Sequence, residues 1–298
     1  KSLKQLPVAG SCDSYGNGVP SHHTISPSFG IGSHSGYLKP TEDRVSVHKI
    51  GVDMILYSVY DGHGGRHYAE AVSKQLPILV KQRIESRLFG EGVIVDDTST
   101  STSSSSSGSE PMLQPQGHAQ ALTHALTSPE ELGDIMRTCM QDIDAKMVEH
   151  SRRNFLLKRG GCTATLALVT KTDVIVANVG DSPSVLFDAH TASLLRETTN
   201  HSPENEDEFV RASGVGGSFI VGRQSGERRL VSRNGNLGLT RAFGQVEFKL
   251  GVEEEQQIVN CQATVDVWNI RQVLAECSQP RTNHMRVDVI DKNKSDNI

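Results

Sequence analysis

Hydrophobic positions early in the chain first follow a two-residue period and then a helical one. Residues 44–60 alternate in the β manner and end in a largely apolar run, which predicts two strands. The second strand leads into Asp-Gly-His-Gly-Gly at 61–65, which is typical of a tight turn. From residue 68 the apolar positions take helical spacing. We expect Pro77 to interrupt this helix, although the spacing continues to residue 88.

A second helix has a clear start signal. Ser128 is placed to cap it, Pro129 suits its first turn, and Glu131 completes a capping box. We interpret its apolar stripe as a core face rather than a ligand site. The stripe consists of Leu132, Ile135, Met136, Cys139, Ile143 and Met147.

The next part of the chain has the pattern of a β-meander. Strands are predicted at 163–169, 174–179 and 184–187. A short helix should follow, capped by Ser202 and ended by Gly214. Antiparallel strands interrupted by long helices favour an α+β layered fold over a βαβ nucleotide-binding fold.

Composition divides the chain into unequal parts. Residues 1–35 are predicted to be an irregular lead-in, and residues 36–298 a single catalytic-type domain. That domain carries a serine-rich insertion at about 96–120, which is too polar to bury a core and is expected to be a disordered surface spacer. A phosphorylatable regulatory loop is the alternative interpretation of the insertion.

Charge and cysteine usage exclude several classes of protein. The 298 residues include 30 Lys and Arg against 35 Asp and Glu, a net charge of −5 that argues against a nucleic-acid partner. No apolar run is long enough to span a membrane. The 5 cysteines form no Cys-x-x-Cys pair, which favours a reducing compartment. We expect a monomer in the cytoplasm, with the nucleus as the alternative location.

Acidic residues gather where predicted strands end. Glu42 and Asp43 precede the first strand, Asp61 follows the second, and Asp181 ends a meander strand. Asp296 lies near the last residue of the sequence. An Asp-Gly at one strand end is usually only a turn, but four acidic strand ends around one sheet predict a cluster of oxygen donors. Such donors suit Mg²⁺ or Mn²⁺ rather than zinc.

Seven segments in order resemble a known enzyme family. They are TEDR (41–44), YSVYDGHGG (57–65), RGGCTATLALV (159–169), VANVGDS (176–182), TNHSPENEDEFVRASG (199–214), VSRNGNLGLTRAFG (231–244) and KSDNI (294–298). The chain is similar through them to the metal-dependent Ser/Thr protein phosphatases of type 2C. That resemblance implies a four-layer α-β-β-α sandwich of two antiparallel sheets, and phosphoproteins as substrates.

The resemblance also implies roles for individual residues. Asp61 matches an aspartate that bridges two Mg²⁺ or Mn²⁺ ions, and His63 matches the proposed proton donor to the leaving serine or threonine oxygen. A turn residue bonded to a carboxylate is the alternative interpretation of His63. The implied metal ligands are Glu42, Asp43, Asp61, Gly62 through its carbonyl, Asp181 for a third and weaker ion, and Asp296.

Three single positions depart from the family pattern. An arginine that forks onto the substrate phosphate is replaced by Leu38, so Lys39 is the candidate phosphate contact, with a point charge in place of a bidentate guanidinium. Pro183 stands where the family has another arginine. Gln245 stands where it has an acid outside the first metal shell.

A fourth departure concerns a whole strand. The family's apolar strand ending in Ala-Ser-Asp-Gly has no counterpart between residues 247 and 296. The nearest sequence is 261–268, followed by a helix-like stretch at 270–277. Asp266 is either a substitute metal ligand or a plain surface residue, and the plain interpretation is favoured.

Two functions therefore compete. The favoured one is a Mg²⁺- or Mn²⁺-dependent protein serine/threonine phosphatase. The other is a phosphatase-like pseudoenzyme with a regulatory or scaffold role. A nucleotide-binding protein is disfavoured, because the glycine-rich turns fit neither a P-loop nor a dinucleotide fingerprint.

Overall fold

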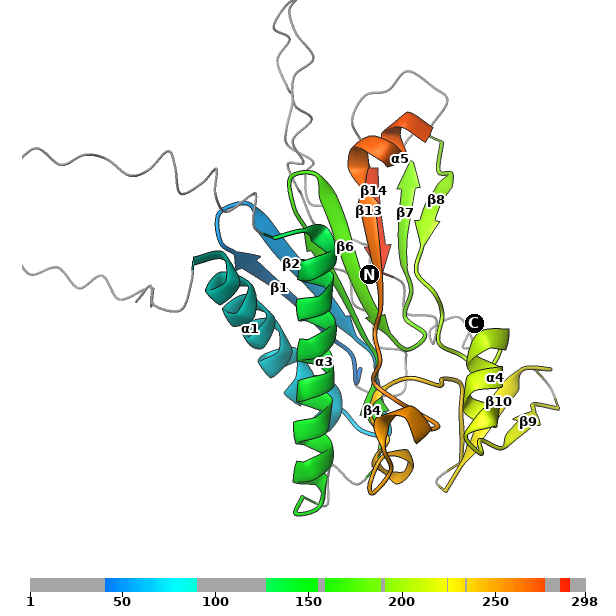
Figure 1. Ribbon diagram of the computed structural model, residues 1–298. Helices are drawn as coiled ribbons and strands as arrows, with labels where there is room; N and C mark the ends of the chain where they lie inside the picture. Colours follow the sequence, from blue (N-terminus) through cyan, green and yellow to red (C-terminus); the bar gives the residue numbers. More distant parts are fainter. Residues whose placement is uncertain are drawn as a thin grey trace, which may run out of the picture.

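A computed structural model describes residues 41–89, 127–154, 159–188, 191–223, 225–233, 235–276 and 285–289 (Figure 1). Lys39 and Asp296, residues 1–35 and the serine-rich insertion lie outside these ranges.

The central element is a five-stranded antiparallel sheet in the order β1-β2-β5-β6-β13. Its strands are β1 (Arg44–Ile50), β2 (Met54–Tyr60), β5 (Ala164–Val169), β6 (Asp173–Val179) and β13 (Thr264–Asn269). β5 and β6 are buried along their whole length, as central strands covered on both faces should be. The two early strands and the strands predicted at 163–169 and 174–179 are confirmed. The third strand predicted for the meander, at 184–187, belongs to a different sheet, so the prediction of a β-meander is wrong.

Two long helices cover one face of this sheet. α1 (His67–Phe89) and α3 (Pro129–Ser151) lie side by side in Figure 1 and share one core with the strands beneath them. The predicted stripe on α3 faces that core. Burial of these apolar side chains is the main stabilising contribution to the layer.

The prediction for Pro77 is wrong. α1 continues through it for three further turns, although proline removes one i→i−4 hydrogen bond. Pro77 is itself buried, and Val80 and Ile84 beyond it are fully buried in the core. Tertiary packing on the sheet therefore outweighs the local cost of the proline.

The two predicted helix starts have different outcomes. Ser128 caps α3 as expected, since its Oγ accepts a hydrogen bond from the backbone N–H of Glu131. The carboxylate of Glu131 accepts instead from Nε of Arg87 on α1. α4 (Glu206–Gly214) is capped by Asn205 and not by Ser202.

The second face of the central sheet packs on a smaller antiparallel sheet in the order β14-β7-β8. Its strands are β14 (Met285–Val289), β7 (Ser184–Asp188) and β8 (Leu194–Glu197), and α5 (Ile270–Glu276) lies beside it. Leu186 of β7 contacts the central sheet in a cluster that includes Val176 and Trp268. These layers agree with the predicted sandwich.

Two minor sheets complete the fold. One is in the order β12-β4-β3, with β12 (Phe243–Gly244), β4 (Gly161–Cys162) and β3 (Gly62–His63). The other combines β9 (Phe219–Val221), β10 (Arg228–Ser232) and β11 (Gly235–Leu237) and forms a lobe with α4 at the lower right of Figure 1. The 3₁₀ turns η2 (Val246–Phe248) and η3 (Glu254–Gln256) follow.

None of the helices in the described ranges is long and apolar enough to cross a membrane.

The contact between α3 and β13 depends on a glycine. A Cβ on Gly133 would lie 2.5 Å from Cγ1 of Val265. We expect Gly133→Ala to lower the free energy of unfolding by about 1–3 kcal/mol in urea titrations, because overpacking outweighs the gain in helix propensity. Gly214→Ala in α4, where a Cβ meets nothing within 4 Å, should be neutral or stabilising. Stabilisation by Gly133→Ala would contradict this packing.

Candidate active site

The candidate site is centred on the segment that follows β2. Asp61 is 5 % exposed, and β3 places Gly62 and His63 directly after it. The turn beyond requires glycine, because Gly64 has φ +70° and a Cβ there would lie 2.8 Å from Cα of Gly160. The chain is thus turned sharply back while Asp61 and His63 are held at the end of the central sheet.

Glu42 contacts the backbone of this segment. Its carboxylate oxygen Oε2 accepts a hydrogen bond of 3.0 Å from the backbone N–H of Gly65. A Cβ on Gly62 would lie 2.7 Å from the carbonyl oxygen of Glu42, so only glycine permits this approach. Asp43 follows, with its Oδ2 accepting from Oγ1 of Thr41 at 2.6 Å. The predicted meeting of the two strand ends is therefore present for Glu42 and Gly62.

Thr163 links Asp61 to the end of β6. Its Oγ1 accepts from the backbone N–H of Asp61 at 3.1 Å and lies 2.9 Å from Oγ of Ser182. Its own N–H donates to the carbonyl of Asp61. Ser182 adjoins Asp181, so this fully buried threonine fixes two candidate acidic turns relative to each other. The sequence analysis missed Thr163, since threonine in a strand usually marks only β propensity.

His201 supports the turn that carries Asp181. Its Nδ1 accepts a hydrogen bond of 3.1 Å from the N–H of Gly180, which makes the neutral ring protonated at Nε2. Burial and then the charge of Arg241 lower the pKa of His201 to about 3. His201 is thus a neutral structural residue, and the sequence analysis had not singled it out.

His63 contacts Gln245, one of the positions that depart from the family pattern. Nε2 of Gln245 lies 2.8 Å from Nε2 of His63. Burial lowers the pKa of His63 to about 4, so its imidazole is neutral near pH 7 in the protein without metal. A contact separated by 182 positions in the sequence gives no local signal.

The oxygen donors at this site fit a hard cation in kind. Asp61 supplies a buried carboxylate, Gly62 a carbonyl, and Glu42 a second carboxylate close by. Within the described ranges, however, no group of three or more His, Cys, Asp or Glu side chains is close enough to hold a metal ion. The oxygen donors are therefore of a suitable kind, but within the described ranges there are too few of them for a complete metal site. The predicted ligand Asp296 lies outside those ranges.

Asp266 lies away from this centre. It lies in the middle of the outer strand β13, where it is paired with Val176 of β6. Thr264, at the start of β13, is paired with Asn178 near the end of β6. Its Oδ2 is buried and has no hydrogen-bond partner among the described residues, and burial raises its pKa. Asp266 is therefore a half-buried residue of the sheet rather than the plain surface residue favoured from the sequence.

A buried charge network lies at the base of the α4 lobe. Glu208 accepts hydrogen bonds from Thr240, Arg211 and Arg241. Burial alone would raise the pKa of Glu208, but the hydrogen bond and charge of Arg241 outweigh burial and lower the pKa to about 2. Arg211 and Arg241 also donate to backbone carbonyls of Thr240 and Gln262, so the network joins α4 to the chain leading to β12.

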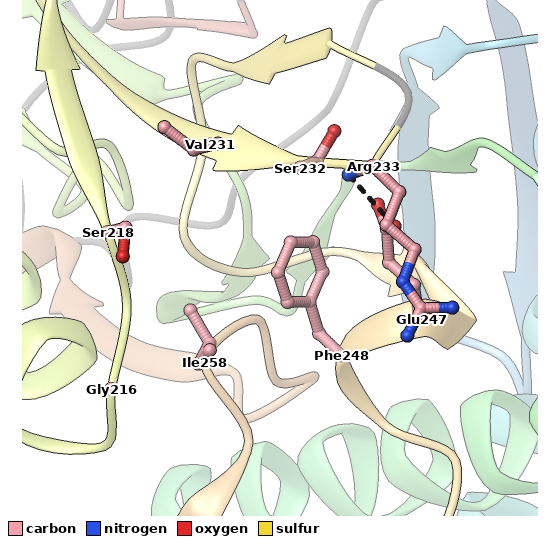
Figure 2. Close-up of a pocket in the computed structure, with 8 residues that line it drawn as sticks. All are labelled: Gly216, Ser218, Val231, Ser232, Arg233, Glu247, Phe248 and Ile258. Carbon is pink, nitrogen blue, oxygen red and sulfur yellow. Dashed lines mark hydrogen bonds between the residues drawn. The ribbon is translucent and has the colours of Figure 1, made fainter.

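A cavity of about 320 Å³ opens between this lobe and η2 (Figure 2). Figure 2 shows Phe248 between Ile258 and Glu247, with the backbone N–H of Arg233 bonded to Glu247. The other lining residues are Gly216, Ser218 and Ser232. None of the predicted site residues lines the cavity, but η2 directly follows Gln245 and so connects the cavity with His63 along the chain.

Comparison with known proteins identifies the family. The model of the family described as Protein phosphatase 2C matches residues 115–273, which is more than half of the chain. The chain therefore belongs to the protein phosphatase 2C family.

Individual relatives agree with this assignment. "Protein phosphatase 2C 1" of Paramecium tetraurelia is 27 % identical over 223 residues, covering 74 % of this chain and 60 % of the relative. "Probable protein phosphatase 2C 11" of Oryza sativa subsp. japonica is 29 % identical over 253 residues, covering 80 % and 65 %. The chain thus spans less than two thirds of the length of these relatives.

Solved structures share the fold. A serine-threonine phosphatase 2C from Toxoplasma gondii superposes with a TM-score of 0.53 at 18 % identity, covering 78 % of this chain and 70 % of that one. A C. elegans sex determining protein gives 0.55 at 22 % identity, covering 79 % and 46 %. At these identities the likeness supports the sandwich fold alone.

The Glu208 network predicts a defined pH dependence of stability. Because the pKa of Glu208 falls from 4.5 to about 2 on folding, its contribution is complete above pH 4.5 and is lost as the pH falls toward 2. Glu208→Gln should lower the free energy of unfolding by about 2 kcal/mol at pH 7 and at pH 5.5.

That difference between Glu208→Gln and wild type should shrink between pH 4.5 and the acid limit of folding. Urea titrations across this range measure it, with the exposed Glu255→Gln as the matched control. A difference that stays constant to pH 3 would contradict the low pKa of Glu208.

Proposed function

We propose that this protein is a Mg²⁺- or Mn²⁺-dependent phosphatase that hydrolyses phosphoserine and phosphothreonine in proteins. The observation that carries the proposal is the segment Asp61-Gly62-His63, in which a buried carboxylate, a carbonyl and an imidazole follow one another at the end of the central sheet. Membership of the protein phosphatase 2C family supports the same chemistry.

In this proposal different residues bind the metal ions, contact the substrate phosphate and transfer the proton. Asp61, the carbonyl of Gly62 and Glu42 hold the cation, with Asp43, Asp181 and Asp296 as further candidate ligands. Bound there, two divalent ions supply a hydroxide at neutral pH and neutralise charge on the phosphoryl oxygens. Lys39 contacts the substrate phosphate as a point charge, and His63 holds the proton that passes to the leaving serine or threonine oxygen.

A pseudoenzyme with a regulatory or scaffold role is the second candidate. Two observations favour it: Gln245 occupies a position next to His63 that is acidic in the family, and the described residues alone do not assemble three metal ligands. The intact segment 61–65 and its contact with Glu42 favour the enzyme, since a chain without catalysis has no need of a buried carboxylate there.

Asp61→Asn tests the proposed metal centre. Loss of the carboxylate charge should lower kcat on a phosphothreonine peptide by at least about 10³-fold and weaken Mn²⁺ binding in calorimetry. Asp53→Asn is the matched control, because Asp53 lies in the exposed turn between β1 and β2, where its carboxylate forms an ion pair with Lys171. Unchanged turnover in Asp61→Asn would reject the site.

His63→Gln separates proton transfer from metal binding. Glutamine is not an acid, so a phosphopeptide, whose leaving alkoxide needs a proton, should lose about 10²-fold in kcat. An aryl phosphate with a good leaving group should lose distinctly less, and Mn²⁺ affinity should change little. Assays on both substrates, with His150→Gln at the exposed end of α3 as control, measure this.

Two results would overturn these assignments. Equal losses on both substrates in His63→Gln would remove His63 from the acid role. Wild-type protein that binds Mn²⁺ and hydrolyses neither substrate would favour the pseudoenzyme.

A further inference from the structure

A buried ion pair lies behind the candidate site. Nζ of Lys249 is 2.5 Å from Oδ2 of Asp144, and their side chains are 1 % and 7 % exposed. Asp144 comes from the middle of α3, whereas Lys249 directly follows η2. Removing two charges from water costs several kcal/mol per ion, and an apolar pair of similar size would often be as stable. The pair is therefore poorly explained by stability alone.

Both partners of the pair bind the backbone of one segment. Oδ1 of Asp144 accepts from the N–H of Gly244 at 2.8 Å, and Nζ of Lys249 also donates to the carbonyl of Ala242 at 2.7 Å. The ion pair thus holds the segment 242–244, which contains β12, from two sides.

The held segment leaves little freedom to the residue that follows. Gly244 has φ +75°, and a Cβ there would lie 2.6 Å from the ring of Tyr68. Gln245 has φ 49° and ψ 47°, a left-handed conformation that is uncommon for glutamine. Its N–H donates to the carbonyl of Gly160 at 3.0 Å. The backbone of Gln245 is therefore fixed before its side chain makes any contact.

The side chain of Gln245 ends at His63. Nε2 of Gln245 lies 2.8 Å from Nε2 of His63, and the side-chain amide can either donate to this nitrogen or accept from it, according to the tautomer of the ring. His63 lies on the outer strand β3 of the small sheet β12-β4-β3, and Gln245 directly follows the other outer strand, β12. The hydrogen bond thus fixes the orientation of the ring and favours one tautomer over the other.

The geometry points to Asp144, Lys249 and Gln245 as a positioning device for His63. The ion pair holds the segment 242–245, which contains β12, and the Gln245 amide holds the imidazole in one orientation and one tautomer. This inference rests on the proposed function for the role of His63. Asp144, Lys249 and Gln245 are positioning residues that do not touch the substrate.

The first test uses the nitrogen-15 NMR spectrum of the imidazoles in protein labelled at histidine, at pH 7.5. His63→Gln identifies the His63 signals by their loss. Wild type should show one predominant tautomer of His63, and Gln245→Leu should give a mixture of tautomers. Gln75→Leu, an exposed change on α1, should leave the signals unchanged.

The second test separates positioning from stability. Lys249→Met leaves Asp144 buried without its partner and should destabilise the protein strongly. The double variant Asp144→Leu/Lys249→Met should recover much of the stability, because the charges are then both absent. It should still show the mixed tautomers of His63, since the segment has lost its hydrogen bonds to both side chains.

Kinetics give the third readout. Gln245→Leu should lower kcat on the phosphopeptide by about 10-fold, with little change in KM and a smaller loss on the aryl phosphate.

The outcomes distinguish this inference from the proposed function. A mixture of tautomers in wild type, or a His63 spectrum unchanged in Gln245→Leu, would overturn the inference whatever the activity. A double variant that regains both stability and the wild-type tautomer would reduce the ion pair to a structural role. Absence of turnover together with the expected spectra would reject the proposed function and leave the positioning of His63 intact.

Discussion

The packing of α3 against the sheet is the constraint on which the rest of the structure depends. At one end of the helix, Gly133 allows contact with Val265 of the outer strand β13. In its middle, Asp144 binds Gly244 and Lys249. The same helix therefore contacts the outer strand β13 and holds β12, and through the small sheet β12-β4-β3 it is connected to His63. A shift of α3 would be transmitted to the site because close-packed interiors deform little.

Local signals explain what could be predicted from the sequence. The cap at Ser128, the alternation in β1 and β2, and the hairpin β5–β6 each depend on residues a few positions apart, and the structure has them where they were expected. β7 leaves the predicted meander for another sheet, which no local signal could show. Pro77 and Asn205 show the limit of such reasoning. Burial on the sheet carries α1 through Pro77, and the turn from Ser202 to Asn205 moves the start of α4 by three residues.

The candidate site divides in the same way. Asp61, Gly62 and His63 form a contiguous motif that can be recognised in the sequence, and the contact of Glu42 with Gly65 follows from the pairing of adjacent strands. Thr163 and Gln245 act through partners 102 and 182 positions away. Neither residue type is unusual where it stands, so only the folded chain shows that they order the site.

Two buried charge networks bracket the segment that carries Gln245. On one side, Glu208 of α4 binds Thr240 and Arg241. On the other, Asp144 of α3 binds Gly244 and Lys249. The segment 240–249 is therefore fixed to two helices by charges that are costly to bury unless every partner is in place.

Both networks bind the same short segment, 240–249. Contacts along this segment therefore connect the lobe of α4, β9 and β10 to the ring of His63. The cavity of Figure 2 lies between that lobe and η2, on the same segment. A displacement of the lobe that disturbs Arg241 would also affect Gln245, because Gln245 is only four residues further along the chain. Gln245 stands at the last step of this connection, where its side-chain amide, unlike a carboxylate, can either donate a hydrogen bond to His63 or accept one from it.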